Sequence, residues 1–125
     1  MILGTGIDLI EVARIADSIA RFGARFLERI FTRAEIDYCE RHQAPALHFA
    51  ARFAAKEACL KALGTGWANG LRFTHIEVQH DARGMPRMQL LEQARSLAIE
   101  LGVGAIHVSL THTEQMAAAV VILER

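Results

Sequence analysis

The sequence carries no excess of either charge, because 14 lysines and arginines balance 14 aspartates and glutamates. This balance argues against nucleic-acid binding driven by overall charge. Apolar residues make up 52% of the chain, yet they form no run approaching the roughly 20 residues of a membrane-spanning helix. The N-terminus also lacks the basic start of a secretion signal. We therefore expect a soluble, cytoplasmic protein that binds neither membranes nor nucleic acids.

Metal and nucleotide motifs are missing as well. The two cysteines, Cys39 and Cys59, do not form a CxxC pair, and each falls in a helical pattern, so we expect both to be buried. No GxxxxGK[ST] phosphate loop is present, and the segment 4–9 has a leucine where a dinucleotide fingerprint has its third glycine. Zinc-like spacing is absent among the histidines His42, His48, His75, His80 and His107.

The 125 residues favour one domain with one core, spanning 1–125. Alternating apolar residues predict strands at 1–10, 73–80, 87–91, 105–112 and 116–124, the last two joined as a hairpin. Helical periodicity predicts helices at 11–22, 24–31, 32–42, 46–63 and 92–101, with loop at 64–70. The result is an α+β domain, helix-rich in its first half and strand-rich in its second.

Asp8 lies in the first predicted strand, where aspartate is uncommon. Its face of that strand also holds Gly4 and Gly6, which leave open space beside the backbone. This combination favours a carboxylate with a function. The alternative is that the strand ends at Asp8, whose side chain then caps the following helix.

The alanine-rich segment 52–66 carries Glu57 and Lys61 on one helical line. As an exposed pair four residues apart, they would contribute only about 0.3–0.5 kcal/mol. The surrounding alanines instead indicate close packing by another element. A charged pair near packed surface loses hydration, and it therefore tends to have a function or a strong partner.

Two other features have both a structural and a functional interpretation. A lone histidine at the end of a strand, such as His112, is more often structural. Residues 14–33 form a local basic patch, which is either a solvated face or a docking surface for an acidic partner. The arginines in this patch are Arg14, Arg21, Arg25, Arg29 and Arg33.

Three segments together resemble a known family. They are GTGIDLIEVARI at 4–15, FAARFAAKEACLKALGTG at 49–66 and HVSLTHTEQMAAAVVILE at 107–124. In this order they are similar to holo-[acyl-carrier-protein] synthases, the short bacterial 4′-phosphopantetheinyl transferases. The most specific piece is Phe53-x-x-Lys56-Glu57-Ala58-x-x-Lys61. The resemblance covers nearly the whole chain, and it implies a helix-rich first half packed on a small, mainly antiparallel sheet.

The resemblance implies a Mg²⁺-dependent transferase that supports fatty acid biosynthesis. Such an enzyme moves the phosphopantetheine arm of coenzyme A onto a serine of apo acyl carrier protein and releases adenosine 3′,5′-bisphosphate. Asp8 and Glu57 would be the metal ligands, and Mg²⁺ typically takes one or two carboxylates plus phosphates and waters. The catalytic set would be Glu57, Lys61 and His112. Glu57 would accept the serine proton, directly or through a metal-bound water, and Lys61 would stabilise or protonate the leaving bisphosphate.

The same resemblance implies a coenzyme site formed by Arg52, Lys56, Lys61, Ser109, His112 and Thr113. Lys56 projects about 100° around the helix from Glu57, so a structural role is its alternative. The larger, two-lobed transferases carry another acid two residues after the aspartate. This sequence has Ile10 there, which fits the short class, where waters complete the metal shell.

Members of the short class are typically homotrimers with sites between subunits, so the Glu57 helix would face a neighbour's Asp8. Their acyl carrier proteins are acidic, and Arg14, Arg21 and Arg25 would dock the acidic helix of the carrier. Two other functions compete with the transferase. One is a non-catalytic module that binds acidic carriers or nucleotides, and the other is an unrelated small enzyme that acts without metal.

Overall fold

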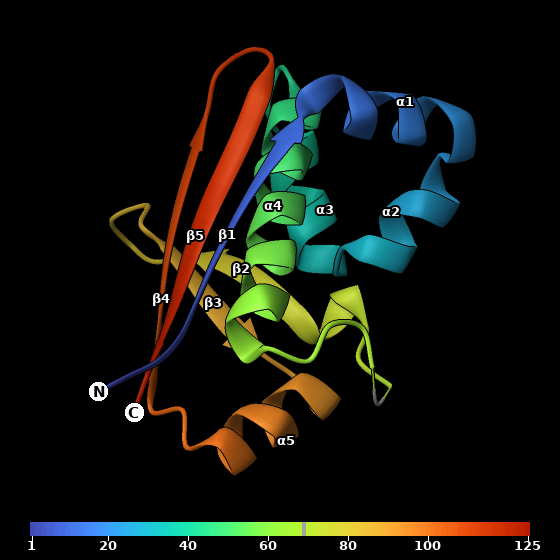
Figure 1. Cartoon of the computed structure of the whole chain (residues 1–125). Coiled ribbons are helices and arrows are strands. Elements are labelled where there is room, and N and C mark those ends of the chain that lie inside the picture. The colour runs from blue at the N-terminus through green and yellow to red at the C-terminus, as the bar shows by residue number, and fades with distance from the viewer. Residues whose placement is uncertain (69) are drawn as a thin grey trace.

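The computed structural model describes residues 1–68 and 70–125, and its elements follow the predicted order (Figure 1). The predicted loop at 64–70 includes Asn69, which lies outside the described residues. The elements are β1 (Ile2–Glu11), α1 (Val12–Phe22), α2 (Ala24–Ile30), α3 (Arg33–Glu40), α4 (Pro45–Leu63), the 3₁₀ turn η1 (Phe73–His75), β2 (Ile76–His80), β3 (Pro86–Leu90), α5 (Glu92–Leu101), β4 (Ala105–His112) and β5 (Met116–Glu124).

Local signals place the ends of the helices. Thr32 and Glu35 form a reciprocal capping box at the start of α3, in which each side chain accepts from the other residue's backbone N–H. Pro45 occupies the first turn of α4, where its missing N–H costs nothing. The same helix ends at Gly64, which adopts the left-handed conformation (φ 79°) that glycine tolerates best.

A three-stranded antiparallel sheet, in the order β1-β5-β4, forms one layer of the molecule (Figure 1). β2 and β3 form a separate antiparallel hairpin. Asp8 pairs with Ala119 in the middle of the β1–β5 ladder, and β1 continues to Glu11. The alternative in which the strand ends at Asp8 is therefore wrong. The residue before α1 is Glu11, and its side chain makes no capping hydrogen bond.

Helix α4 packs directly against β1 and β5. Its inward positions are small, and the alanines at 50, 51, 54, 55, 58 and 62 are all buried. Strand β1 has glycines where it meets α4, and a side chain at either would clash. A Cβ built on Gly6 would lie 1.8 Å from the carbonyl oxygen of Ala58, and a Cβ built on Gly4 would lie 2.1 Å from the carbonyl oxygen of Ala62. The alanine-rich helix and the glycine-containing strand are thus two halves of one close backbone contact, which places Asp8 next to α4.

The predicted strand at 73–80 is only partly correct, because Phe73–His75 form η1 and β2 begins at Ile76. The cause is tertiary. The buried ammonium of Lys56 donates to the carbonyl oxygens of Phe73 (3.0 Å) and of Ile76. Both carbonyls turn toward α4, and this tightens the backbone between them.

Both cysteines are fully buried free thiols, as the sequence predicts. Burial raises the pKa of each thiol to about 12. Among the residues that the structure describes, no helix is both long and apolar enough to cross a membrane.

Candidate functional site

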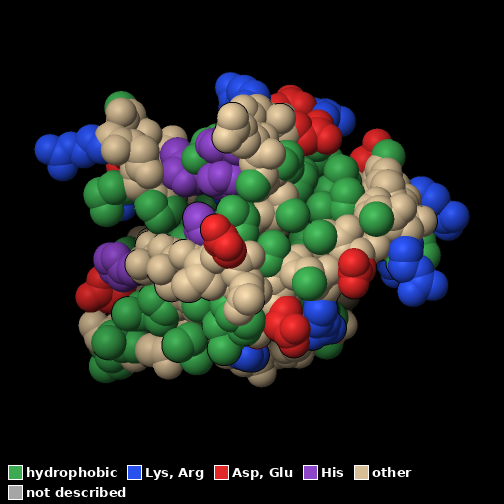
Figure 2. Space-filling view, turned by 90° about the horizontal axis from the view of Figure 1, so that it is seen from above, with side chains coloured by type: hydrophobic (Ala, Val, Ile, Leu, Met, Phe, Trp, Pro, Cys, Tyr) green, Lys and Arg blue, Asp and Glu red, His purple; other side chains and the backbone are tan. Residues whose placement is uncertain are grey.

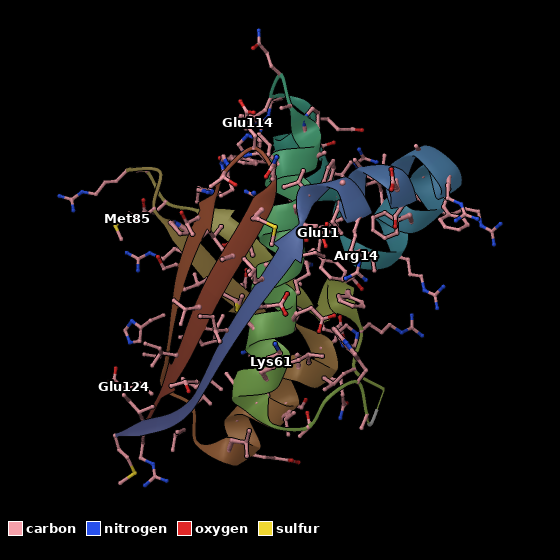
Figure 3. The ribbon with its side chains drawn as sticks, turned by 45° about the horizontal axis from the view of Figure 1, so that its top comes forward. Glu11, Arg14, Lys61, Met85, Glu114 and Glu124 are labelled. Atoms are coloured by element: carbon pink, nitrogen blue, oxygen red, sulfur yellow. The ribbon has the colours of Figure 1, made fainter. Side chains whose placement is uncertain are left out.

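Lys61 links the last turn of α4 to β1. Its Nζ donates to Asp8 Oδ1 at 3.1 Å and to the carbonyl oxygen of Ile7 at 2.9 Å, and Figure 3 shows it reaching from the helix toward the strand. The interpretation of Lys61 as the partner of Glu57 in an exposed helical pair is therefore wrong. Its hydrogen-bond partners come from a strand more than fifty residues earlier in the chain. The Asp8 side chain is only 18% exposed, so this contact is partly shielded from water.

Glu57 lies beside Asp8 of the same chain. Burial raises the pKa of the Glu57 carboxyl, and the negative charge of Asp8 raises it further. A hydrogen bond from Trp67 and the positive charge of Lys61 act in the opposite direction. Helix α4 packs on β1 of the same chain and Lys61 bonds to its Asp8, so the expectation that the Glu57 helix faces a neighbour's Asp8 is wrong.

A pocket of about 360 Å³ opens at this point. It is lined by Glu57, Leu60, Lys61, Gly64, Gly66 and Trp67. Trp67 could not be predicted as part of this site, because a single tryptophan after a helix gives no local signal of contact with a carboxylate. The pocket therefore combines one acid, one lysine and one aromatic wall, and Lys61 connects it to a second acid, Asp8, on β1.

The donor set fits a divalent cation that prefers oxygen ligands. Mg²⁺ is usually held by one or two carboxylates and completes its octahedral shell with phosphates and waters. Within residues 1–68 and 70–125, no group of three or more histidine, cysteine, aspartate or glutamate side chains could hold a metal ion. Asp8 and Glu57 would thus act as a two-carboxylate site and not as part of a protein cage.

Arg52 projects from α4 into a second group of polar side chains. It is only 2% exposed, and its guanidinium lies over the Tyr38 ring, 4.2 Å from the centroid. Its terminal nitrogens contact His80 Nδ1 at 3.1 Å and the carbonyl oxygen of His48 at 3.4 Å. Its Nε is buried without a hydrogen-bond partner.

Four histidines gather around Arg52, and Figure 2 shows histidine side chains clustered on one face of the molecule. The ring centroids of His42 and His48 lie 3.8 Å apart, and the ring centroids of His48 and His112 lie 5.9 Å apart. We call this group the Arg–His cluster; its members are Tyr38, His42, His48, Arg52, His80 and His112. It brings together two predicted coenzyme-binding residues, Arg52 and His112. The sequence did not indicate the other members, because they come from separate elements and follow no short spacing.

The Arg–His cluster predicts acid-sensitive stability. Burial lowers the pKa of His48 from 6.5 to about 4, and the nearby charges of His42, Arg52 and His112 add to the effect. Between these two values the unfolded chain binds a proton that the folded chain does not, so the free energy of unfolding falls as the pH drops below about 6.5. We expect His48→Gln to remove part of this loss, on the order of 1 kcal/mol after solvent screening. Thermal melts of the wild-type and His48→Gln proteins at pH 5 and pH 7.5 measure this loss of stability. An equal loss in the two proteins would contradict the prediction.

The other predicted coenzyme residues do not join this cluster. Ser109 is exposed on β4, and the alternation of the strand turns it to the face opposite His112. Thr113 Oγ1 accepts from the backbone N–H groups of Gln115 (3.2 Å) and Met116 (3.0 Å), and it thereby shapes the β4–β5 turn. Lys56 is fully buried and bonded inside the protein.

The predicted docking arginines are exposed on α1 and α2. Arg14, Arg21 and Arg25 take part in no ion pair among the described residues. Figure 2 shows lysine and arginine side chains toward the end of the molecule where these helices lie. Arg33 differs, because it pairs with Asp37 at 2.8 Å. The unpaired part of the patch therefore includes the three arginines predicted to meet a partner, together with Arg29.

Fold and site together define a class of protein. Residues 4–121 match the model of the 4′-phosphopantetheinyl transferase superfamily. This match covers most of β1 and all of α4, which supply the two acids and Lys61. It also covers β4, which carries His112.

Similar chains narrow the class further. A holo-[acyl-carrier-protein] synthase of Koribacter versatilis is 53% identical over 124 residues, which is 99% of each chain. The crystal structure of such a synthase from Neisseria meningitidis has a TM-score of 0.90 at 35% identity and covers all of both chains. The Helicobacter pylori synthase in complex with coenzyme A has a TM-score of 0.85 at 31% identity, with coverage of 96% of this chain and 99% of that one. The chain therefore belongs to the holo-[acyl-carrier-protein] synthase family.

Proposed function

We propose that this protein transfers the 4′-phosphopantetheine arm of coenzyme A to a serine of apo acyl carrier protein and releases adenosine 3′,5′-bisphosphate. The observation that carries the proposal is that Glu57 and Lys61 line one pocket while Lys61 also bonds to Asp8, whose charge acts on Glu57. Two acids can hold a cation against a diphosphate, and a lysine beside them can meet the leaving group. The chemical setting is the activation of carriers for fatty acid biosynthesis in the cytoplasm.

We infer that Asp8 and Glu57 hold Mg²⁺ in the working enzyme. When bound, the ion supplies positive charge that stabilises the diphosphate as negative charge develops on it. The side chains supply hard oxygen ligands at the end of a close helix–strand contact, which fixes their spacing. Lys61 already donates to Asp8, so its ammonium lies where the same charge develops.

Glu57 is our candidate for the group that accepts the proton of the carrier's serine hydroxyl. Glu57 lines the pocket next to Lys61 and could accept this proton directly or through a water, and the water route fits a carboxylate that also holds a cation. Lys61 would give its proton to, or remain hydrogen-bonded with, the departing bisphosphate. These roles divide the proton transfers between two residues that are one helical turn apart.

The predicted metal site and the predicted coenzyme site use strands at opposite edges of the sheet. Asp8 lies on β1 and His112 lies on β4, with β5 between them. Ile7 and Leu9 also leave the outer face of β1 apolar and exposed, at 67% and 64%. Both features support a homotrimer in which one copy places its β4 edge near the β1 edge of the next. Coenzyme A would then meet Asp8 of one chain and the Arg–His cluster of its neighbour.

Docking of the carrier should depend on the exposed arginines. Reversing the charge of Arg14, Arg21 and Arg25 together is expected to weaken binding of an acidic carrier by at least about tenfold at low salt, because charge complementarity is lost. Added salt should weaken wild-type carrier binding by screening the same attraction. Carrier titrations at two ionic strengths measure both effects. Arg83→Glu, in the β2–β3 turn, is the control, and equal carrier affinity in the triple variant would end the docking proposal.

The function itself is tested by incubating the protein with coenzyme A, Mg²⁺ and apo carrier. Mass spectrometry should show one phosphopantetheine added to the carrier, and a chelator should stop the reaction. No mass gain at high enzyme concentration would reject the transferase. Carrier binding without any metal-dependent gain would instead favour a non-catalytic module.

A further inference from the structure

A buried ion pair joins α3 to α4 at the residue directly before Glu57. Lys56 Nζ lies 2.7 Å from Glu35 Oε1, and both side chains are 0% exposed. Within residues 1–68 and 70–125 it is the one ion pair fully hidden from solvent. Both charges lose their hydration, so such a pair contributes little net stability and is better explained by the geometry that it fixes.

The remaining hydrogen bonds of the pair show which geometry this is. Lys56 also donates to the carbonyl oxygens of Phe73 and Ile76, at the two ends of η1. Glu35 Oε2 accepts from the backbone N–H of Val78 in β2 at 2.8 Å. All three ammonium donors of Lys56 are therefore used inside the protein. None is left for a phosphate, and this favours the structural alternative for Lys56 over a coenzyme contact.

From Phe73 the contacts lead back to the reactive pocket. The Phe73 ring stacks on the Phe53 ring of α4, with the two ring centroids 5.5 Å apart. Its centroid also lies 3.9 Å from that of the Trp67 ring. Trp67 in turn lines the same pocket as Glu57. The path that starts at Lys56 thus ends at the very next residue of the same helix.

Trp67 has room to leave this position. It also borders a second pocket of about 520 Å³, which Phe73 lines as well. A ring between two open pockets stays in place only if its neighbours hold it there. Phe73 is such a neighbour, and the Lys56 ammonium fixes the backbone of Phe73.

We propose that Lys56, anchored by Glu35, is a positioning residue for Glu57, acting through Phe73 and Trp67. The proposal rests on the transferase function assigned above to Glu57. Without the ammonium, the carbonyls of η1 lose their donor and Phe73 shifts. Trp67 then turns toward the second pocket, and the Glu57 carboxylate is no longer held facing Asp8.

The test uses Glu35→Gln/Lys56→Met, which leaves no unpaired buried charge and keeps an acceptor for the capping box. We expect the folded double variant to lose at least about tenfold in kcat while KM for coenzyme A stays within twofold, because Lys56 does not touch the coenzyme. Trp67 is the only tryptophan in the chain, so its fluorescence reports its position directly. Its emission should shift and its quenching by acrylamide should increase.

A second variant breaks the same path at another point. Phe73→Leu keeps the ion pair and is expected to give a similar loss of kcat and a similar change in Trp67 emission. Combining it with the double variant should add little further loss, because residues that act in one path are not additive. Arg33→Gln/Asp37→Asn removes an exposed ion pair of α3 and serves as the matched control, with no change in either readout.

The possible results separate the proposal from its competitors. Wild-type kcat and unchanged Trp67 emission in a folded double variant would overturn it. A raised KM for coenzyme A with unchanged kcat and emission would return Lys56 to the coenzyme site and overturn it as well. If the double variant does not fold, Phe73→Leu decides by the same two readouts. If the wild-type protein modifies no carrier, the proposed function fails, whereas Trp67 emission still shows whether Lys56 holds the tryptophan.

Discussion

Asp8→Asn and Glu57→Gln are each expected to lower kcat/KM for carrier modification by about a thousandfold or more, which corresponds to roughly 4 kcal/mol of transition-state stabilisation. Each change removes one of the two negative charges that lie on either side of Lys61. The remaining carboxylate cannot hold a divalent cation against a diphosphate alone. Glu57→Gln also removes the proton acceptor proposed for the serine, so it should be at least as severe as Asp8→Asn.

The amide replacements keep the fold while removing the charge. Asparagine at position 8 can still accept a hydrogen bond from Lys61, and glutamine at position 57 has nearly the same size and shape as the glutamate that it replaces. Near-wild-type thermal melts are therefore expected for both variants, and Glu100→Gln on exposed α5 is a matched control for activity. The rate is measured by the mass gain of the carrier. A near-wild-type rate in either folded variant would contradict the proposed chemistry, and an unfolded Glu57→Gln protein would assign Glu57 a structural role.

Local sequence signals were sufficient for most of the fold because each acts over a few residues. The capping box at Thr32 and Glu35 places the start of α3, and glycine at 64 places the end of α4. Alternation of apolar residues places β4 and β5, where buried and partly exposed side chains alternate along β5. The prediction was inaccurate at η1, where distant carbonyls bind Lys56. A contact between residues 17 apart leaves no trace in the local pattern.

The candidate site divides in the same way. Asp8 was recognisable because aspartate is out of place in a strand that also has small neighbours. The partner of Lys61 could not be recognised from the sequence. Helical spacing indicated Glu57, whereas the fold supplies Asp8 from another element. The ion pair of Glu35 could not be predicted for a different reason. The capping box already explained why an acid is present at that position. The same carboxylate also binds Lys56, and only the packed structure reveals this second use.

Gly6→Ala is expected to be the most damaging single methyl addition at the site. The new Cβ would lie 1.8 Å from the carbonyl oxygen of Ala58 and 2.9 Å from the backbone N of Ala62. Both are backbone atoms of α4, so no side chain can rotate away and β1 must move as a whole. Overpacking of this kind costs about 3 kcal/mol or more. That is a large fraction of the 5–15 kcal/mol that typically stabilises a domain.

The displacement should also reach the chemistry, because Asp8 is two residues from Gly6 on the same face of β1. We expect the melting temperature to fall by roughly 10 °C or more, and the protein that remains folded should modify its carrier far more slowly. Gly84→Ala is the matched control: Gly84 has a left-handed φ of 84° but nothing within 4 Å of the added methyl. It should cost only about 1 kcal/mol and leave the rate unchanged. If Gly6→Ala melted and reacted like Gly84→Ala, the close approach of β1 to α4 could not be what sets the distance between the two acids.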